Sequence, residues 1–141
     1  MNQLPQWEEL DHPADVRLRI RGDTLQDLFD NAADALIEVL VDPESVQGVD
    51  AVDLEAEGTD RELLLIHWLQ EILFLFDAEE FAPSHVEHIR LEEGHVRGRL
   101  RGERIDPSRH EIRNQPKAVT RHEVDIARED GGYEVTVVID V

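Results

Sequence analysis

The stretch LLLIHWLQEILFLF, residues 63–76, decides how the rest of the chain must fold. Its apolar residues go round almost the whole circumference of a helix, which is typical of a helix enclosed by other elements. The stretch is too short, and carries too many polar side chains, to span a membrane. We therefore expect a helix from about residue 60 to 76 in the middle of the core, with Thr59 and Glu62 as a capping box at its start.

Two further elements are expected before the central helix, each with its own periodicity. In DVRLRIRG, residues 15–22, apolar residues alternate with arginines, and this predicts a half-buried strand. An apolar helical stripe runs from Leu25 to Leu40, and Thr24 with Asp27 resembles a capping box at its start. Alternation returns in VDLEAEG, residues 52–58, and predicts a strand directly before the central helix.

Beyond the central helix the sequence consists of strand-like pieces. Residues 85–102, HVEHIRLEEGHVRGRLRG, predict a hairpin that turns near Glu93 and Gly94. Two last strands are expected in KAVTRHEVDIAR, residues 117–128, and YEVTVVIDV, residues 133–141. The EDGG between them is a strong hairpin signal.

This order of elements predicts an α+β fold. Two helices would pack on one face of a mostly antiparallel β-sheet, in a sandwich-like arrangement. The 141 residues fit a single domain, residues 1–141, within which about 83–116 form a small strand-rich insert. The N-terminal residues lack a basic region followed by an apolar run, so we expect no secretory signal and a cytoplasmic protein.

The charge of the chain is strongly one-sided. Its 33 acidic and 14 basic residues give a formal net charge of −19. This field disfavours extended contact with nucleic acid and suits a cation or a basic protein surface. Of the basic residues, Lys117 is the one lysine, and the other 13 are arginines. A high-salt cytoplasm and a GC-rich genome would each explain this composition, and the sequence does not decide between them.

Most signatures of catalysis are missing from the sequence. There is no cysteine, no GxSxG elbow, no P-loop, no dinucleotide-binding glycine pattern and no HExxH. His85 and His88 lie three apart in an expected strand, so they should face opposite sides and are better read as surface residues than as a metal pair. No residue pair stands out as nucleophile and general base, so a stand-alone metal-dependent hydrolase is a weak reading of this sequence.

Carboxylates at the two ends of the sequence offer a candidate metal site. Asp140 lies at the end of the last expected strand, beside Val141, and Asp15 begins the first one. If these strands are neighbours, Asp15 could meet Asp140 and the main-chain carboxylate of Val141, a donor set that suits a hard cation such as Ca²⁺ or Mg²⁺. From spacing alone, a solvated residue at a frayed strand end is the better reading of Asp140.

Five segments, in order, resemble the archease family. DHPADVRLRIRGDTLQDLFDNAADAL resembles the opening of that family, and LLLIHWLQEILFLFD its second helix. GERIDPSRHEI, KAVTRHEVDI and YEVTVVIDV are similar to its remaining segments, so the resemblance covers about residues 7–141. Pro13, where the family usually has Thr, and Arg121, where Tyr is common, depart from its pattern.

The resemblance implies a function that composition does not. Archeases are partners of the RtcB-type tRNA-splicing RNA ligase, whose guanylylation and multiple turnover they promote without being enzymes themselves. By the same resemblance the metal ligands are Asp15, Asp140 and Val141, the cation is Ca²⁺ with Mg²⁺ or Mn²⁺ as alternatives, and Lys117 contacts phosphate or the ligase. The alternative is a general chaperone or assembly module with a structural divalent-metal site. No membrane partner is expected.

Overall fold

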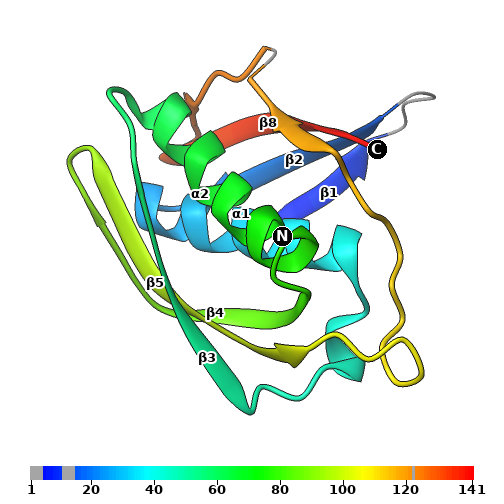
Figure 1. The fold of residues 1–141 in the computed structure, drawn as a ribbon. Helices are drawn as coiled ribbons and strands as arrows, with labels where there is room; N and C mark the ends of the chain where they lie inside the picture. The colour runs from blue at the N-terminus through cyan, green and yellow to red at the C-terminus, as the bar shows by residue number, and fades with distance from the viewer. Residues whose placement is uncertain (1–4, 11–14, 122) are drawn as a thin grey trace.

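The computed structural model describes residues 5–10, 15–121 and 123–141. The elements in chain order are β1 (Trp7–Leu10), β2 (Val16–Gly22), α1 (Leu25–Leu40), the 3₁₀ helix η1 (Pro43–Ser45), β3 (Asp50–Glu57), α2 (Arg61–Asp77), β4 (Phe81–Glu92), β5 (His95–Arg104), β6 (Ala118–Thr120), β7 (Ala127–Glu129) and β8 (Gly132–Asp140). Figure 1 shows α1 and α2 lying between two layers of strands.

All the strand pairs in the described part of the chain are antiparallel, which confirms the α+β class. One sheet has the order β1-β2-β8-β6, with β7 also paired to β8, and the other has the order β3-β5-β4. The strands thus form two sheets, and the helices have strands on both sides (Figure 1). The residues expected to form a strand-rich insert supply most of β4 and all of β5.

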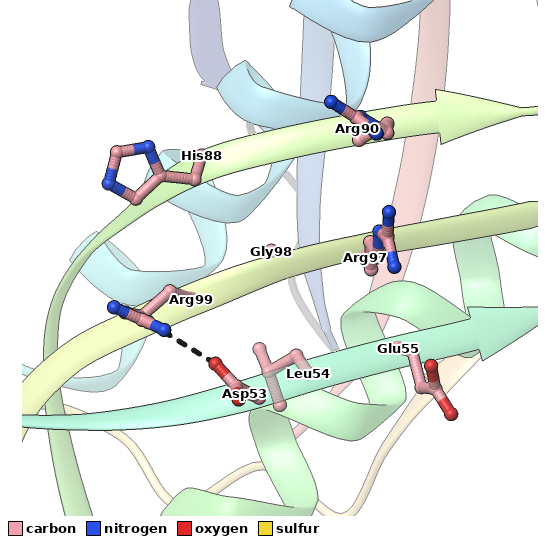
Figure 2. Close-up of a pocket in the computed structure, with 8 residues that line it drawn as sticks. All are labelled: Asp53, Leu54, Glu55, His88, Arg90, Arg97, Gly98 and Arg99. Atoms are coloured by element: carbon pink, nitrogen blue, oxygen red, sulfur yellow. Dashed lines mark hydrogen bonds and ion pairs between the residues drawn. The ribbon is translucent and has the colours of Figure 1, made fainter.

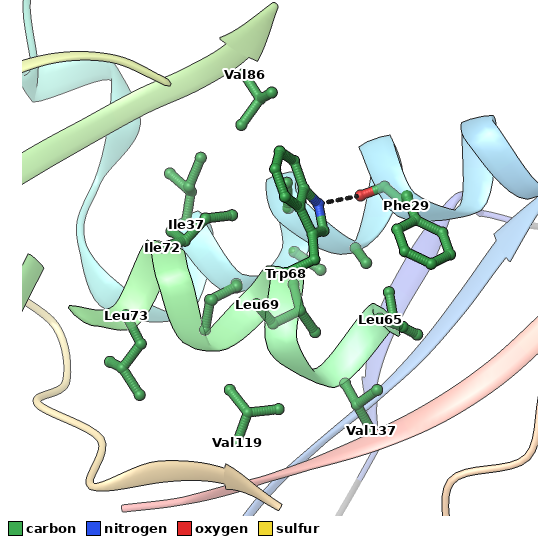
Figure 3. Packing of buried hydrophobic residues seen from close by; sticks show 14 of the residues in the cluster. Phe29, Ile37, Leu65, Trp68, Leu69, Ile72, Leu73, Val86, Val119 and Val137 are labelled. Atoms are coloured by element: carbon green, nitrogen blue, oxygen red, sulfur yellow. Dashed lines mark hydrogen bonds between the residues drawn. The ribbon is translucent and has the colours of Figure 1, made fainter. Parts of the chain in front are cut away.

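Helix α2 fills the space between the sheets, as its apolar sequence predicts. Trp68 is fully buried, and its indole N–H donates to the Phe29 carbonyl of α1 at 3.2 Å. Figure 3 shows Val86 of β4 on one side of α2 and Val119 and Val137 of the larger sheet on the other. Neither α1, α2 nor any other helix in the described ranges has the length and apolar character that crossing a bilayer requires.

The first turns of α1 and α2 show which residues cap the two helices. The Thr24 hydroxyl accepts from the Asp27 N–H at 3.0 Å, which confirms the first cap. At α2 the capping residue is Asp60, whose carboxylate accepts from the Leu63 N–H at 2.8 Å, so the predicted Thr59 and Glu62 box is wrong by one residue. Asp60 fits because its short carboxylate reaches an amide three residues on, as a capping side chain does.

Both predicted hairpin turns are confirmed. Gly94 turns β4 into β5 with a φ of 73°, and Asp130 and Gly131 turn β7 into β8 with φ values of 46° and 83°. Two positive φ values in succession match the twist of a two-residue antiparallel hairpin, and glycine and aspartate tolerate them.

Two strand predictions need correction. The single strand expected over residues 117–128 is two short strands, β6 and β7, both paired with β8. Glu123, with a φ of 56°, breaks the extended backbone between them. Strand β1 was not expected from the sequence, although it pairs with β2 from Trp7 opposite Ile20 onward.

Candidate functional site

Strand pairing brings the predicted site residues together at the end of β8. Val16 of β2 is paired with Ile139 of β8, so Asp15, one residue earlier, lies at the position next to Asp140. On the other edge of β8 the Lys117 N–H donates to the Asp140 carbonyl at 2.7 Å. The end of β8 and the start of β2 lie side by side in Figure 1. The expected neighbourhood of the first predicted strand and the last is confirmed.

Alternation along β8 decides which way its side chains point. Val135, Val137 and Ile139 belong to the core cluster, so alternation places Asp140 on the opposite face, which it shares with Thr136 and the buried Val138. Asp15 lies on the same face as Arg17, because its Oδ1 is 3.8 Å from the Arg17 Nε. The two predicted carboxylates therefore share one face of the sheet, although they come from opposite ends of the sequence.

Arginines of β2 set the electrostatics of this face. Arg17 lies between Asp15, at 3.8 Å, and Glu123, at 3.9 Å. Further along the strand Arg19 pairs with Glu8 at 3.0 Å and with Glu134 at 3.1 Å. The carboxylate of Asp140 has no ion pair with a basic residue in the described part of the chain, so it remains open to a cation or a partner.

The donor chemistry at this strand end fits a hard cation. Asp15 and Asp140 offer carboxylate oxygens, and Val141, the third ligand expected from the sequence, directly follows Asp140. Thr120 lies one strand away, opposite Val138, and its buried hydroxyl has no hydrogen-bond partner within the described ranges. A buried hydroxyl without a partner calls for a water or an ion, and sequence reasoning missed it because β6 is too short to show its own pattern.

A metal site built from side chains alone would need a third His, Asp or Glu beside Asp15 and Asp140. No such side chain joins them among the described residues. Across residues 5–10, 15–121 and 123–141 no group of three or more such side chains is placed to hold a metal ion. Within these residues, a cation at Asp15 and Asp140 would take its other ligands from main-chain oxygens and water. This is common for Ca²⁺, which takes carboxylate, carbonyl and water oxygens together. Asp11, His12 and Pro13, which precede Asp15 in the sequence, lie outside the described residues.

Lys117 lies just before β6, across β8 from Asp15. Its side chain is exposed, and its ammonium makes no ion pair within the described part of the chain. Its backbone is fixed by the hydrogen bond to Asp140, whereas its side chain extends on a flexible stem. A compact ammonium with three donors can follow a phosphate or carboxylate that approaches this strand end.

The histidines of β4 do not behave as predicted. His85 and His88 were expected on opposite sides, but both approach the same carboxylate, with Nε2 of each 3.8 Å from an oxygen of Glu87. A bulge between Glu87 and Arg90, with His88 at a φ of 56°, breaks the alternation on which that prediction relied. Their reading as surface residues fits their exposure.

A second polar cluster, which sequence reasoning missed, fixes the segment after β5. Glu103 is buried and accepts hydrogen bonds from the Gln47 N–H at 2.7 Å and from the ring of His110 at 3.0 Å. A further bond from Arg109 is the main reason why the pKa of Glu103 falls to about 2. The other ring nitrogen of His110 accepts from the Asp106 N–H at 2.8 Å. Because the cluster satisfies its own charges, it holds the loop instead of offering a site.

Comparison with known proteins identifies the family. A family model described as the Archease protein family (MTH1598/TM1083) matches residues 7–141. The chain is 41% identical over 138 residues to Protein archease of Methanopyrus kandleri, covering 96% of this chain and 99% of the relative. The solution structure of protein 1598 of Methanobacterium thermoautotrophicum matches with a TM-score of 0.82 and 33% identity, over 96% of this chain and 99% of that one.

A more distant structure supports the fold alone. The crystal structure of a Thermotoga maritima protein, described as an archease and possible chaperone, has a TM-score of 0.68 at 17% identity and full coverage of both chains. The near-complete match to the family model and the identity with the Methanopyrus relative together assign the chain. It belongs to the archease family.

Proposed function

We propose that this protein is a non-enzymatic, cation-binding activator of an RtcB-type tRNA-splicing RNA ligase, which promotes guanylylation of the ligase and its multiple turnover. The observation that supports this most is the meeting of Asp15, Asp140 and Lys117 at one end of β8. Two carboxylates and an exposed ammonium, which has no ion pair among the described residues, suit a surface that acts on phosphate chemistry in a partner. Membership of the archease family supports the choice of partner.

In this proposal each residue has a separate task. The oxygens of Asp15 and Asp140, together with the Val141 carboxylate, hold a divalent cation, with Ca²⁺ as the first candidate and Mg²⁺ or Mn²⁺ as alternatives. When bound, the cation supplies positive charge for phosphate oxygens. Arg17 holds the Asp15 carboxylate on the outer face, and the Lys117 N–H fixes the backbone of Asp140. The Lys117 ammonium then contacts phosphate or an acidic group of the ligase.

The charge of the whole chain fits a protein partner. With a net charge of −19, the surface would repel an extended RNA backbone but would be drawn to a basic surface on the ligase. We place the protein in the cytoplasm with that ligase. Association should then weaken as salt rises, because screening shortens the range of the attraction.

The direct test is multiple-turnover ligation by the cognate ligase with and without this protein. Addition should raise the number of turnovers and the fraction of guanylylated ligase. Asp15→Asn, Asp140→Asn and Lys117→Ala should each reduce this stimulation at least tenfold. The exposed Glu79, which follows α2, provides the matched control, and Glu79→Gln should stimulate fully. Equal turnover with and without the protein would reject the proposal.

A second reading, a general chaperone or assembly module with a structural metal, has one observation in its favour. The Thermotoga relative is described as a possible chaperone, and Val49 and Phe74 are large apolar side chains exposed by 64% and 54% in this protein. Suppression of citrate synthase aggregation separates the two readings. A chaperone suppresses it and loses this effect in Phe74→Ser, whereas an activator leaves aggregation unchanged.

A further inference from the structure

Two arginines lie next to each other on the smaller sheet, and neither has an acidic partner among the described residues. Arg90 of β4 is paired directly with Arg97 of β5, and both side chains are exposed. Neither forms an ion pair or a hydrogen bond with another side chain in the described part of the chain. Figure 2 shows them on adjacent strands, apart from the joined pair of Arg99 and Asp53. The other arginines of β5 all have acidic partners: Arg99 with Asp53 at 3.2 Å, Arg101 with Glu87 at 2.8 Å and Arg104 with Glu80 at 3.4 Å.

An irregularity of β4 creates this arginine pair. The register shifts by one residue between Glu87 and Arg90, where His88 has a left-handed backbone with a φ of 56°. Uninterrupted pairing beyond Glu87 would place Ile89 opposite Arg97 and turn Arg90 toward the helices. The extra residue instead brings Arg90 to the outer face, beside the other guanidinium.

Both parts of this arrangement are unfavourable for the isolated chain. The left-handed backbone of His88 is unfavourable for a residue with a side chain. Like charges directly opposite each other in a sheet are also destabilising. Acidic side chains are abundant, 33 in the whole chain, yet Glu55, the neighbour of Arg97 on β3, pairs with His95 at 3.4 Å instead. The two guanidiniums therefore remain available for an anion from outside the molecule.

The surroundings of the pair indicate which anion fits. Arg90 and Arg97 line an open hollow of about 660 Å³, together with His88 and the backbone of Gly98. Two guanidinium forks match the charge and the oxygens of a phosphate dianion, whereas one fork is enough for a carboxylate. Asp53 and Glu55 lie on the β3 side of the same hollow and would repel a long polyanion.

We propose that Arg90 and Arg97 bind a single phosphate group, carried by a small phosphate monoester. The site lies on the sheet opposite the one that bears Asp15 and Asp140, with the helices between the two sheets (Figure 1). It is therefore independent of the proposed cation site, and either can fail without the other.

The test is titration of the ¹⁵N-labelled protein with inorganic phosphate at low ionic strength, followed by amide and arginine side-chain shifts. Shifts should concentrate on residues 88–98, and phosphate should bind at least tenfold more tightly than acetate. Arg90→Gln and Arg97→Gln should each weaken phosphate binding at least tenfold. Arg104→Gln, on the same strand but paired with Glu80, is the matched control and should bind within twofold of the unaltered protein.

Three further measurements make the outcome decisive. Arg97→Lys keeps the charge but loses the fork, so binding should fall several-fold without disappearing. Without phosphate, Arg90→Gln should keep or raise the melting temperature, because a repulsion is removed. Added phosphate should raise the melting temperature of the unaltered protein and of Arg104→Gln by more than that of Arg90→Gln or Arg97→Gln. Adenosine monophosphate should bind at least as well as inorganic phosphate and adenosine should not bind. Equal phosphate affinity in the unaltered protein, Arg90→Gln and Arg97→Gln, or equal affinity for acetate, overturns the proposal.

Discussion

Replacement of Asp34 by asparagine should stabilise the protein at neutral pH, and the gain should disappear on acidification. Asp34 is a half-buried residue of α1. Burial raises the pKa of its carboxyl from 3.8 to about 6, with a smaller contribution in the same direction from Asp30. The nearby His85 acts in the opposite direction. The native state thus holds the Asp34 charge at a cost that the unfolded chain does not have.

The size of the effect follows from the two pKa values. A difference of about two pKa units corresponds to about 3 kcal/mol, and because the group is partly solvated we expect about 1–2 kcal/mol. An acid whose folded pKa is raised destabilises the native state fully above pH 6 and not at all well below 3.8. Asp34→Asn should therefore raise the free energy of unfolding by that amount at pH 7.5, and by about a third of it at pH 4.5.

Urea denaturation of both proteins at pH 7.5, 6 and 4.5, followed by circular dichroism, measures this difference. Glu79→Gln removes an exposed charge and is the control, for which the difference from the unaltered protein should be small and nearly constant with pH. A loss of stability in Asp34→Asn at pH 7.5, or a gain of equal size at all three pH values, would show that burial does not control this carboxyl.

Three more predictions concern the core, the loop cluster and the cation site. Trp68→Ala removes the largest fully buried side chain between the sheets, so it should lower the free energy of unfolding by about 3–5 kcal/mol, measured by urea denaturation. Phe74→Ala, on the exposed side of the same helix, is the control and should change the free energy of unfolding by less than about 1 kcal/mol. Hydrogen bonds hold the pKa of Glu103 at about 2, below its usual 4.5, so this group contributes stability that is complete above pH 4.5 and is lost as the pH falls toward 2. Glu103→Gln should therefore lower the melting temperature at pH 7 and differ progressively less from the unaltered protein below pH 4.5; a melting temperature unchanged at pH 7 would count against this role. A short tag after Val141 turns its carboxylate into a neutral amide and should weaken Ca²⁺ binding in calorimetry, and Asp140→Asn should weaken it further; equal affinity in tagged and untagged protein would remove Val141 from the proposed ligands.

Local periodicity explains what the sequence could predict. Helix α1 and strand β2 carry their burial pattern in consecutive residues, so their type and their buried faces follow from spacing alone. The hairpin turns at Gly94 and Gly131 were visible for the same reason, because glycine meets a local backbone demand. Asp15 and Asp140 were predictable only on the condition that their strands pair, since no local pattern states which strands are neighbours.

The features that escaped prediction depend on contacts between distant segments. The bulge at His88 has no glycine to mark it. Its one signal in the sequence is that the apolar positions change from even, at Val86, to odd, at Ile89 and Leu91. Thr120 is buried because of what covers β6 in three dimensions, and a strand this short shows no period. The bulge brings Arg90 to the surface, and the phosphate proposal depends on it. The buried Thr120 hydroxyl bears on the fit of the cation site.

The position of β8 has a consequence for biosynthesis. In the larger sheet β2, β6 and β7 all pair with β8, which is the last of these strands to leave the ribosome. Until it emerges, β2 has β1 as its one partner in the described part of the chain, whereas β3, β4 and β5 can already assemble beside α1 and α2. A ribosome-bound chain should therefore hold a folded half and an open apolar surface, closed only after translation passes residue 140.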